Sequence, residues 1–297
     1  MRDYKRTIGS TTFDIGNIII MLLLCAITLY PFLFVVSRSI MPDAERAAHP
    51  YALIPTTGIT VQGYTYMFGA GSRVIQGYLI TIFRTVVGTI LSVICEAMFA
   101  YALSKKYYPL RGFLTVMIAI TLWFGAGIIP RFLVVRMVGL YNSIWVFVLA
   151  PLMGAWGIII MRTFFSQLPD SLEESAKLDG ANDVRILFQI VFPLSTPVLA
   201  TMALFSVVYH WNEWFSGIIY IADPNKVPIM VLLWQTLQQA AAQIRGDSRG
   251  ADVNYVVPPT LTIKMSLIVI TSFPIVVAYP FFQKYFVKGM LIGSIKG

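Results

Sequence analysis

Two charged residues, Arg84 and Glu96, lie inside one long apolar run of the sequence. A charged side chain at the centre of a membrane helix costs about 2.5–3.5 kcal/mol on insertion scales, so each needs a polar partner or a water-filled cavity. In a straight helix the two residues lie about 18 Å apart along the axis and about 120° apart around it, so they cannot pair with each other. Each must therefore meet a neighbour on another element.

Gly88 and Ser92 stand between these charges at intervals of four residues, which gives the helix one small and polar side. This side could line a cavity, in which the planar guanidinium of Arg84 would hold a carboxylate or the hydroxyl groups of a ligand. It could equally pack against another helix through its small residues, with the charges in structural ion pairs. The sequence leaves both interpretations open.

A second polar group lies near the end of another apolar run and consists of Trp211, Asn212, Glu213 and Trp214. Indole faces beside an amide and a carboxylate suit stacking on a sugar ring and hydrogen bonding to its hydroxyls. Tryptophan is also enriched at membrane interfaces, so the group can instead anchor or break a helix. The carboxylate of Glu213 would disfavour an acidic ligand unless a base such as Arg84 or Lys264 pairs with it.

The elements that must position these residues are membrane helices. Of the 297 residues, 57% are hydrophobic and only 12% are charged, which is roughly half the charged content of a soluble domain. A helix needs about 20 mainly apolar residues to cross the hydrocarbon. Six segments satisfy this requirement: 15–36, 75–103, 110–129, 143–165, 190–221 and 261–286. We therefore predict an all-α integral membrane protein with one transmembrane domain over residues 15–286.

Prolines and glycines predict that the fourth and fifth spans are broken. The breaks are expected near Pro151, Gly154 and Gly157, near Pro193 and Pro197, and near Gly217. The first apolar run exceeds the 7–15 residues or so of a signal-peptide core, so we expect it to be retained as a span. Cys25 and Cys95 both lie in apolar runs, and we infer no disulfide or metal site from them.

The basic residues flank apolar runs and form no stripe, so the net charge of +8 indicates membrane topology rather than nucleic-acid binding. Six spans place both termini on one side, which carries 12 Lys and Arg residues in short segments against 9 on the other. The positive-inside rule then places residues 1–14 and 287–297 in the cytoplasm. Two long polar segments, 37–74 and 222–259, would lie outside, as a docking surface or as connectors.

A charged stretch at about 169–189 separates the fourth and fifth spans on the cytoplasmic side. Ser171 and Glu174 have the spacing of a capping box, which predicts a short helix from Ser171. That helix should end at Gly180, since glycine readily takes the left-handed C-cap conformation. A second helix should begin near Asn182 or Asp183. The pair could dock into a groove of another protein or lie on the lipid headgroups.

The run EESAKLDGA at residues 173–181 resembles the "EAA" cytoplasmic loop of permease subunits of binding-protein-dependent type I ABC importers. Ser175 stands where that family has its first alanine, a change of small residue for small residue. Residues 100–112, 160–181, 210–221 and 279–297 resemble carbohydrate-importer permeases, including the second permease of the maltose type. The chain is similar in particular to the subgroup for complex, often acidic, oligosaccharides such as alginate or pectin fragments. The resemblance covers most of the chain after Val74.

This resemblance implies a non-catalytic permease subunit in the bacterial inner membrane, forming half of a heterodimeric transmembrane domain. Its partners would be a second permease, two ATPase subunits that hold ATP and Mg²⁺, an external binding protein and membrane lipid, with an oligosaccharide as substrate. The chain itself would bind no cofactor, metal or nucleic acid. The residues expected to couple to the ATPase are Glu173, Glu174, Ser175, Ala176, Asp179, Gly180 and Ala181, with Gly289, Gly293 and Lys296 in the C-terminal tail. The candidates for the substrate path are Arg84, Glu96, Trp211, Asn212, Glu213 and Trp214.

Several motifs are absent from the sequence, and their absence agrees with this interpretation. No G-x-x-x-x-G-K-[ST] loop is present, so the chain cannot supply a Walker-type nucleotide site. His210 has no local nucleophile motif that would make it a catalytic base. The alternative is a secondary transporter driven by an ion gradient, in which Glu96 and Glu213 would carry protons. Such folds commonly contain internal repeats, and no convincing repeat is found here.

Overall fold

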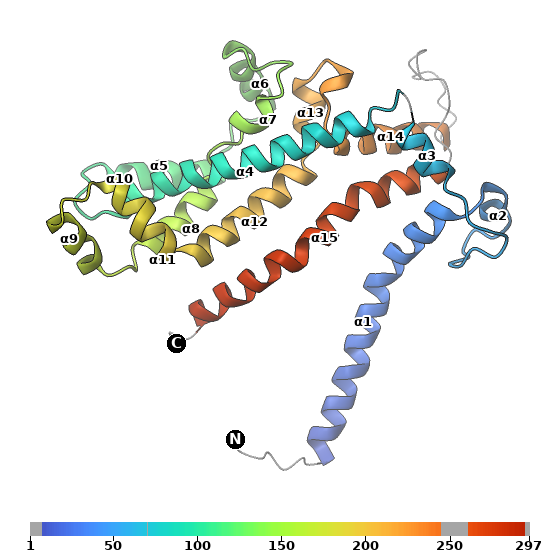
Figure 1. Cartoon of the computed structure of the whole chain (residues 1–297), viewed down its shortest axis with the longest axis horizontal. Helices are drawn as coiled ribbons and strands as arrows, with labels where there is room; N and C mark the ends of the chain where they lie inside the picture. Colours follow the sequence, from blue (N-terminus) through green and yellow to red (C-terminus); the bar gives the residue numbers. More distant parts are fainter. Residues whose placement is uncertain (1–7, 70, 245–260, 295–297) are drawn as a thin grey trace. The chain divides into compact units, whose positions relative to one another are not determined.

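The computed structural model describes residues 8–69, 71–244 and 261–294, and all regular secondary structure in these ranges is helical (Figure 1). The chain divides into two compact units. Unit 1 comprises Met1–Ser72 and Thr236–Ser272, and unit 2 comprises Arg73–Gln235 and Phe273–Gly297. The predicted all-α membrane fold is confirmed.

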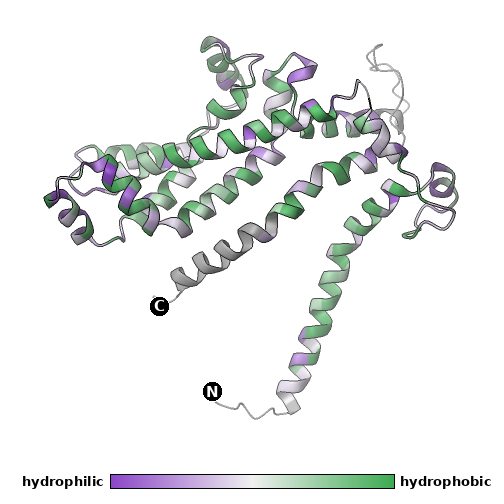
Figure 2. Cartoon of the chain, in the orientation of Figure 1, coloured by the Kyte–Doolittle hydropathy of each residue, from purple (hydrophilic) through white to green (hydrophobic). Residues whose placement is uncertain are grey.

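Unit 1 contains α1 (Ile8–Ile40), α2 (Asp43–Ala48), α3 (Gln62–Phe68) and the first part of α15 (Leu261–Ser294). Figure 2 shows apolar residues around most of α1, and none of its best membrane-spanning window is buried. A helix that is apolar on all sides is stable in lipid rather than in water. This agrees with the predicted first span.

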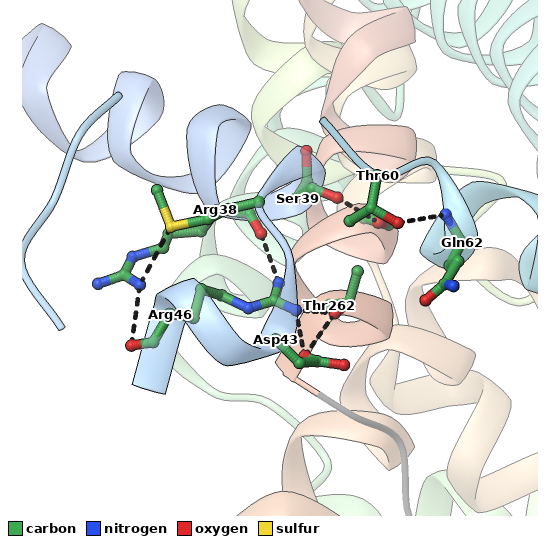
Figure 3. Close-up of polar contacts among 9 residues, drawn as sticks. Arg38, Ser39, Asp43, Arg46, Thr60, Gln62 and Thr262 are labelled. Atoms are coloured by element: carbon green, nitrogen blue, oxygen red, sulfur yellow. Dashed lines mark hydrogen bonds and ion pairs between the residues drawn. The ribbon is translucent and has the colours of Figure 1, made fainter. Parts of the chain in front are cut away.

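A polar network joins the end of α1, helix α2 and the start of α15 within unit 1 (Figure 3). The guanidinium of Arg46 contacts Asp43 and Thr262 and donates through Nη1 to the carbonyl oxygen of Arg38 at 2.6 Å. Arg38 in turn donates through Nη2 to the carbonyl oxygen of His49 at 3.0 Å. The first part of the segment that was predicted as a long polar connection, from Arg38 to His49, therefore forms an ordered corner that these hydrogen bonds hold against the start of α15.

Unit 2 is built on α4 (Val74–Ser104), which packs against α8 (Ala155–Phe165) and α12 (Thr196–Asn212) (Figure 1). The other elements that lie wholly within this unit are α5 (Arg111–Trp123), α6 (Ile128–Met137), α7 (Val146–Leu149), α9 (Asp170–Leu178), α10 (Asp183–Ile186), the π-helical turn η1 (Leu187–Val191), α11 (Phe192–Leu194), α13 (Phe215–Tyr220) and the 3₁₀ turn η2 (Pro224–Lys226). Helix α14 (Ile229–Ile244) runs through a segment that the sequence predicted to be a loop.

Three described helical segments are long and apolar enough to span a membrane: Gly9–Ile40, Val74–Ser104 and Leu261–Ala278. Two bent pairs raise this number to as many as five, namely Arg111–Trp123 with Ile128–Met137, at 119°, and Asp183–Leu194 with Thr196–Asn212, at 87°. The six-span count therefore remains a prediction. The third predicted span differs most, because its helix stops at Trp123 and the chain turns at Gly127, whose φ is +73°.

The predicted breaks in the fourth and fifth spans are mostly found. Helix α7 ends at Leu149 and α8 begins at Ala155, so the fourth span is interrupted around Pro151 as expected. The fifth is interrupted at Ser195, close to the predicted prolines. Its second break falls at Glu213, earlier than predicted, and Gly217 lies inside α13.

Helix α15 continues without interruption to Ser294. The boundary predicted between the last span and a tail at residue 287 is therefore not an end of the helix. Gly289 and Gly293 belong to this helix, whereas Lys296 lies outside the described residues.

Candidate functional site

A cavity of about 630 Å³ lies within unit 2, a volume inside the range of about 300–1,000 Å³ typical of small-molecule sites. Its walls come from α4, α8, α12 and α13 and from the segments around α6 and α7. The charged and titratable residues that line it are Arg84, Glu96, Arg131, Tyr209, His210, Glu213 and Tyr220. Three of the predicted substrate-path residues therefore share one cavity.

Arg84 and Glu213 form an ion pair in the wall of this cavity. Nη2 of Arg84 donates to Oε2 of Glu213 at 3.0 Å, and the guanidinium carbon lies 4.9 Å from the centre of the Phe147 ring. The side chain of Arg84 is only 1% exposed, and its Nε and Nη1 have no hydrogen-bond partner among the described residues. Of the two bases that the sequence offered for Glu213, the partner is thus Arg84.

Glu213 also organises the helix break in which it lies. Its Oε1 accepts a hydrogen bond from the backbone N–H of Ser216 at 2.7 Å, and its Oε2 contacts the hydroxyl of the same serine. A carboxylate in this position satisfies an exposed amide at the start of α13. One side chain therefore caps a helix and neutralises a buried cation.

Glu96 has a different partner, as the helical geometry predicted. Its Oε1 accepts a hydrogen bond from the backbone N–H of Gly154 at 2.8 Å, where α8 begins. The positive end of the helix dipole favours a carboxylate here. A side chain at Gly157 would collide with Oε2 of Glu96, so this glycine makes room for the carboxylate.

The row of small residues on α4 serves both purposes that the sequence left open. Arg84, Ser92 and Glu96 line the cavity, whereas Gly88 packs against the buried ring of His210. A Cβ atom at position 88 would lie 2.5 Å from Nε2 of that ring. The same side of one helix therefore contributes to a cavity and to a close helix contact.

Of the four residues at 211–214, only Glu213 lines the cavity. Trp211 packs beside Tyr78, with 6.2 Å between ring centres, and Trp214 stacks on Trp234 at 5.3 Å. Nδ2 of Asn212 donates to the carbonyl oxygen of Val208 at 2.9 Å, at the last turn of α12. This arrangement fits the interpretation of the group as a helix break, and sugar stacking by the indoles stays a prediction.

Arg131 and His210 line the cavity but were not predicted to do so. Arg131 falls between the third and fourth predicted spans, and the sequence did not predict the turn at Gly127 that places α6. His210 was considered only as a catalytic base. No local spacing in the sequence indicates either position, since both depend on how α6, α12 and α4 pack.

The predicted pair of short helices is present as α9 and α10, and Figure 2 shows hydrophilic residues gathered on them. The predicted capping box is wrong. Helix α9 begins at Asp170 with Pro169 in the N-cap position and no side-chain cap, which places Ser171 inside the first turn. Proline is tolerated at this point because its missing N–H would have no partner within the helix.

The predicted C-terminus of α9 and the predicted N-terminus of α10 are confirmed. Gly180 has φ +79°, and the N–H of Ala181 donates to the carbonyl oxygen of Ala176 at 2.9 Å, which closes the C-terminus of α9. Helix α10 starts at Asp183, and the side chain of Asn182 accepts from the N–H of Arg185 at 2.8 Å. Gly180 and the N-cap asparagine therefore determine the turn between α9 and α10.

The residues predicted to couple to an ATPase divide into two sets. Glu174, Ser175, Asp179 and Gly180 are exposed, and Ala181 is half-buried. Ala176 is buried in the core of unit 2 with Tyr101 and Ile186, and Glu173 forms an ion pair with Lys105. By contrast Leu178, which was not among the predicted residues, is 89% exposed. The inner face of α9 therefore packs against the rest of unit 2, and its outer face is exposed.

Comparison with known proteins places this architecture in a family. The profile of the family described as "Binding-protein-dependent transport system inner membrane component" matches residues 56–292. The chain belongs to this family. The members of this family are the permease subunits of ABC transporters, which are non-catalytic. Because the family is described as an inner-membrane component, this permease is an inner-membrane protein.

Relatives match almost the whole length of the permease. It is 39% identical to the polygalacturonan/rhamnogalacturonan transport system permease protein YtcP of Bacillus subtilis (strain 168), over 95% of this chain and 96% of the relative. It is 38% identical to protein LplC of the same organism, over 98% and 97%. A crystal structure of a bacterial ABC transporter involved in the import of the acidic polysaccharide alginate matches with a TM-score of 0.82 and 30% identity, over 95% of this chain and 99% of that chain. The fold resemblance inferred from the sequence is thus confirmed.

Proposed function

We propose that this permease is the membrane subunit of an ATP-driven importer that receives an acidic oligosaccharide from an external binding protein and releases it into the cytoplasm. The observation that carries the importer assignment is the α9–α10 pair, which is anchored on its inner face and presents Leu178 and the exposed residues of 174–180 on its outer face. Such a surface suits insertion into a groove of a partner protein.

The complete transporter would contain a second permease, two ATPase subunits and the binding protein. ATP and Mg²⁺ would be bound by the ATPases, and both termini of this chain would lie in the cytoplasm. Closure of the ATPases around ATP would displace α9 and shift the permease toward an outward-open state, and hydrolysis would return it. In this scheme the ATP-bound ATPases shift the permease because they bind its outward-open state more tightly, and ATP hydrolysis supplies the free energy for the cycle.

The acidic nature of the substrate is suggested by two relatives, whose names refer to polygalacturonan and alginate, both polymers of acidic sugars. The cavity supports this choice through Arg84, a guanidinium in its lining whose positive charge attracts a carboxylate. Arg131 provides a second cation in the lining. The Arg84–Glu213 pair keeps the binding weak enough for release, because Glu213 competes with the substrate.

Uptake by the reconstituted complex tests this function. The permease would be co-expressed with the second permease and the ATPase, placed in proteoliposomes and supplied with the binding protein and labelled trigalacturonate. We expect uptake that requires both ATP and the binding protein, that persists with a proton ionophore, and that exceeds uptake of a neutral trisaccharide. Uptake without ATP that collapses with the ionophore would instead support the ion-driven alternative, with Glu96 and Glu213 as proton carriers.

A further inference from the structure

Helix α9 is attached to the end of α4 by one sheltered ion pair, Lys105 with Glu173. Lys105 is the C-cap residue of α4, and its Nζ lies 4.0 Å from the centre of the Tyr101 ring. The two charged side chains are only 12% and 16% exposed. Partial burial strengthens the attraction between the charges, because water screens them less. The aromatic face of Tyr101 separately stabilises the ammonium group of Lys105.

The neighbouring ion pair of the same segment is different. Lys106 and Asp170 lie 3.2 Å apart, but their side chains are 79% and 76% exposed. Exposed pairs contribute little, because water screens the attraction and both side chains must be ordered to form them. The exposed pair of Lys106 with Asp170 therefore serves as a matched control for the pair of Lys105 with Glu173, since Lys106 directly follows Lys105 in the chain.

Helix α4 links this ion pair to the cavity. It runs unbroken and without proline from Val74 to Ser104, and Arg84 and Glu96 line the cavity from it. The covalent path from α9 toward α12 passes through η1 and then bends by 87° near Ser195. The path toward α8 passes through the non-α-helical turn at 166–169. The Lys105 contact therefore joins α9 directly to the longest straight element that reaches the cavity.

We propose that Lys105 and Glu173 are positioning residues that transmit a displacement of α9 to α4, and so to the cavity residues Arg84 and Glu96; this inference rests on the proposed importer function. Loss of Lys105 should leave α9 folded, since Glu173 lies in its first turn, where the helix dipole favours a carboxylate. The ATPase would still dock on the exposed face of α9, but its motion would no longer be passed fully to α4.

The experiment compares sugar transported per ATP hydrolysed by the full complex in proteoliposomes. We expect Lys105→Ala and Glu173→Ala to co-purify with the ATPase and hydrolyse ATP, while the transport ratio falls at least about fivefold, the lower end of typical coupling between sites. The control Lys106→Ala should keep the wild-type ratio. The exchange of charges in Lys105→Glu/Glu173→Lys should restore the transport ratio, because an ion pair can form again. The recovery should be only partial, since each charge then lies at the unfavourable end of its helix dipole.

Three results would count against the inference. These are an unchanged ratio in Lys105→Ala, an equal loss in Lys106→Ala, or no recovery in a charge-exchanged complex that assembles normally. A wild-type complex without ATP-driven uptake would overturn the proposed function instead. The two failures are therefore distinguished by the wild-type measurement alone.

Discussion

Arg84 and Glu213 are separated by 129 positions in the sequence, and their side chains meet at 3.0 Å in the wall of the cavity. The pair joins the N-terminal third of α4 to the break between α12 and α13. Because Arg84 is almost fully buried, its charge depends on this carboxylate and on the face of Phe147 for stabilisation.

Removal of Arg84 alone should therefore be costly. We expect Arg84→Met to lower the free energy of unfolding by about 3 kcal/mol, the lower end of values for broken buried ion pairs, since Glu213 retains some exposure to water. The double variant Arg84→Met/Glu213→Gln should be clearly more stable than Arg84→Met, because glutamine keeps the bond to Ser216 without an unpaired charge. Thermal unfolding in nanodiscs measures both. Equal stability of the single and double variants would show that the pair is not coupled.

Substitution of Gly88 tests the close contact with His210. A methyl group at position 88 would lie 2.5 Å from Nε2 and 2.6 Å from Cε1 of a buried ring that has little room to move. We expect Gly88→Ala to destabilise the permease by about 1–3 kcal/mol, as overpacking of a core usually does. In the control Gly112→Ala the added methyl meets nothing within 4 Å and should be neutral or slightly stabilising. Similar melting temperatures for the two variants would contradict the packing described here.

The ordered corner after α1 should respond to acid through Glu45. Hydrogen bonds from Thr57 and Thr56, with the Thr57 hydroxyl as the largest effect, lower the pKa of Glu45 to about 2 from its ordinary 4.5. Because the folded pKa is depressed, the stabilisation is complete above about pH 4.5 and is lost as the pH falls toward 2. The protection of the Thr56 and Thr57 amides against hydrogen exchange, taken relative to the intrinsic exchange rate at each pH, should fall over this interval in the wild type. In Glu45→Gln this protection should be low already at neutral pH and change little on acidification; protection equal to that of the wild type would refute this role.

Gly180 should be required for its backbone conformation and not for space. Its φ of +79° is left-handed, while a Cβ atom there would meet nothing within 4 Å. We expect Gly180→Val to cost about 1–2 kcal/mol of local stability, seen as faster hydrogen exchange in α9, and Gly180→Asn to cost less. If both variants exchanged like the wild type, the C-cap would not depend on glycine.

The sequence predicts those features of this protein that are encoded locally. Gly180 and Asn182 define the α9–α10 turn because each residue type suits one backbone geometry or one capping bond, and Pro151 marks the interruption between α7 and α8. The need of Arg84 and Glu96 for separate partners follows from helix geometry and the cost of a charge in lipid. These inferences require no knowledge of packing.

Features that depend on tertiary contacts were not predictable in the same way. The ion pair of Lys105 with Glu173 joins residues 68 positions apart, and no local spacing indicates it. The turn at Gly127 divides an apolar run whose composition alone suggests one span. Arg131 enters the cavity lining only through that turn, and His210 only through the gap left by Gly88. The predicted start of α9 was wrong because Pro169, and not Ser171, occupies the N-cap position.

Cross-linking at Leu178 tests the central claim, that α9 docks into an ATPase subunit. Cys25 and Cys95 would be replaced first, and a single cysteine introduced as Leu178→Cys or, as a control of similar exposure, Met137→Cys; the native side chains are 89% and 85% exposed. We predict that the cysteine at 178 cross-links to the co-expressed ATPase with a yield that changes on addition of ATP, whereas that at 137 does not. Absence of any cross-link at 178 in a complex that contains the ATPase and transports sugar would contradict the account.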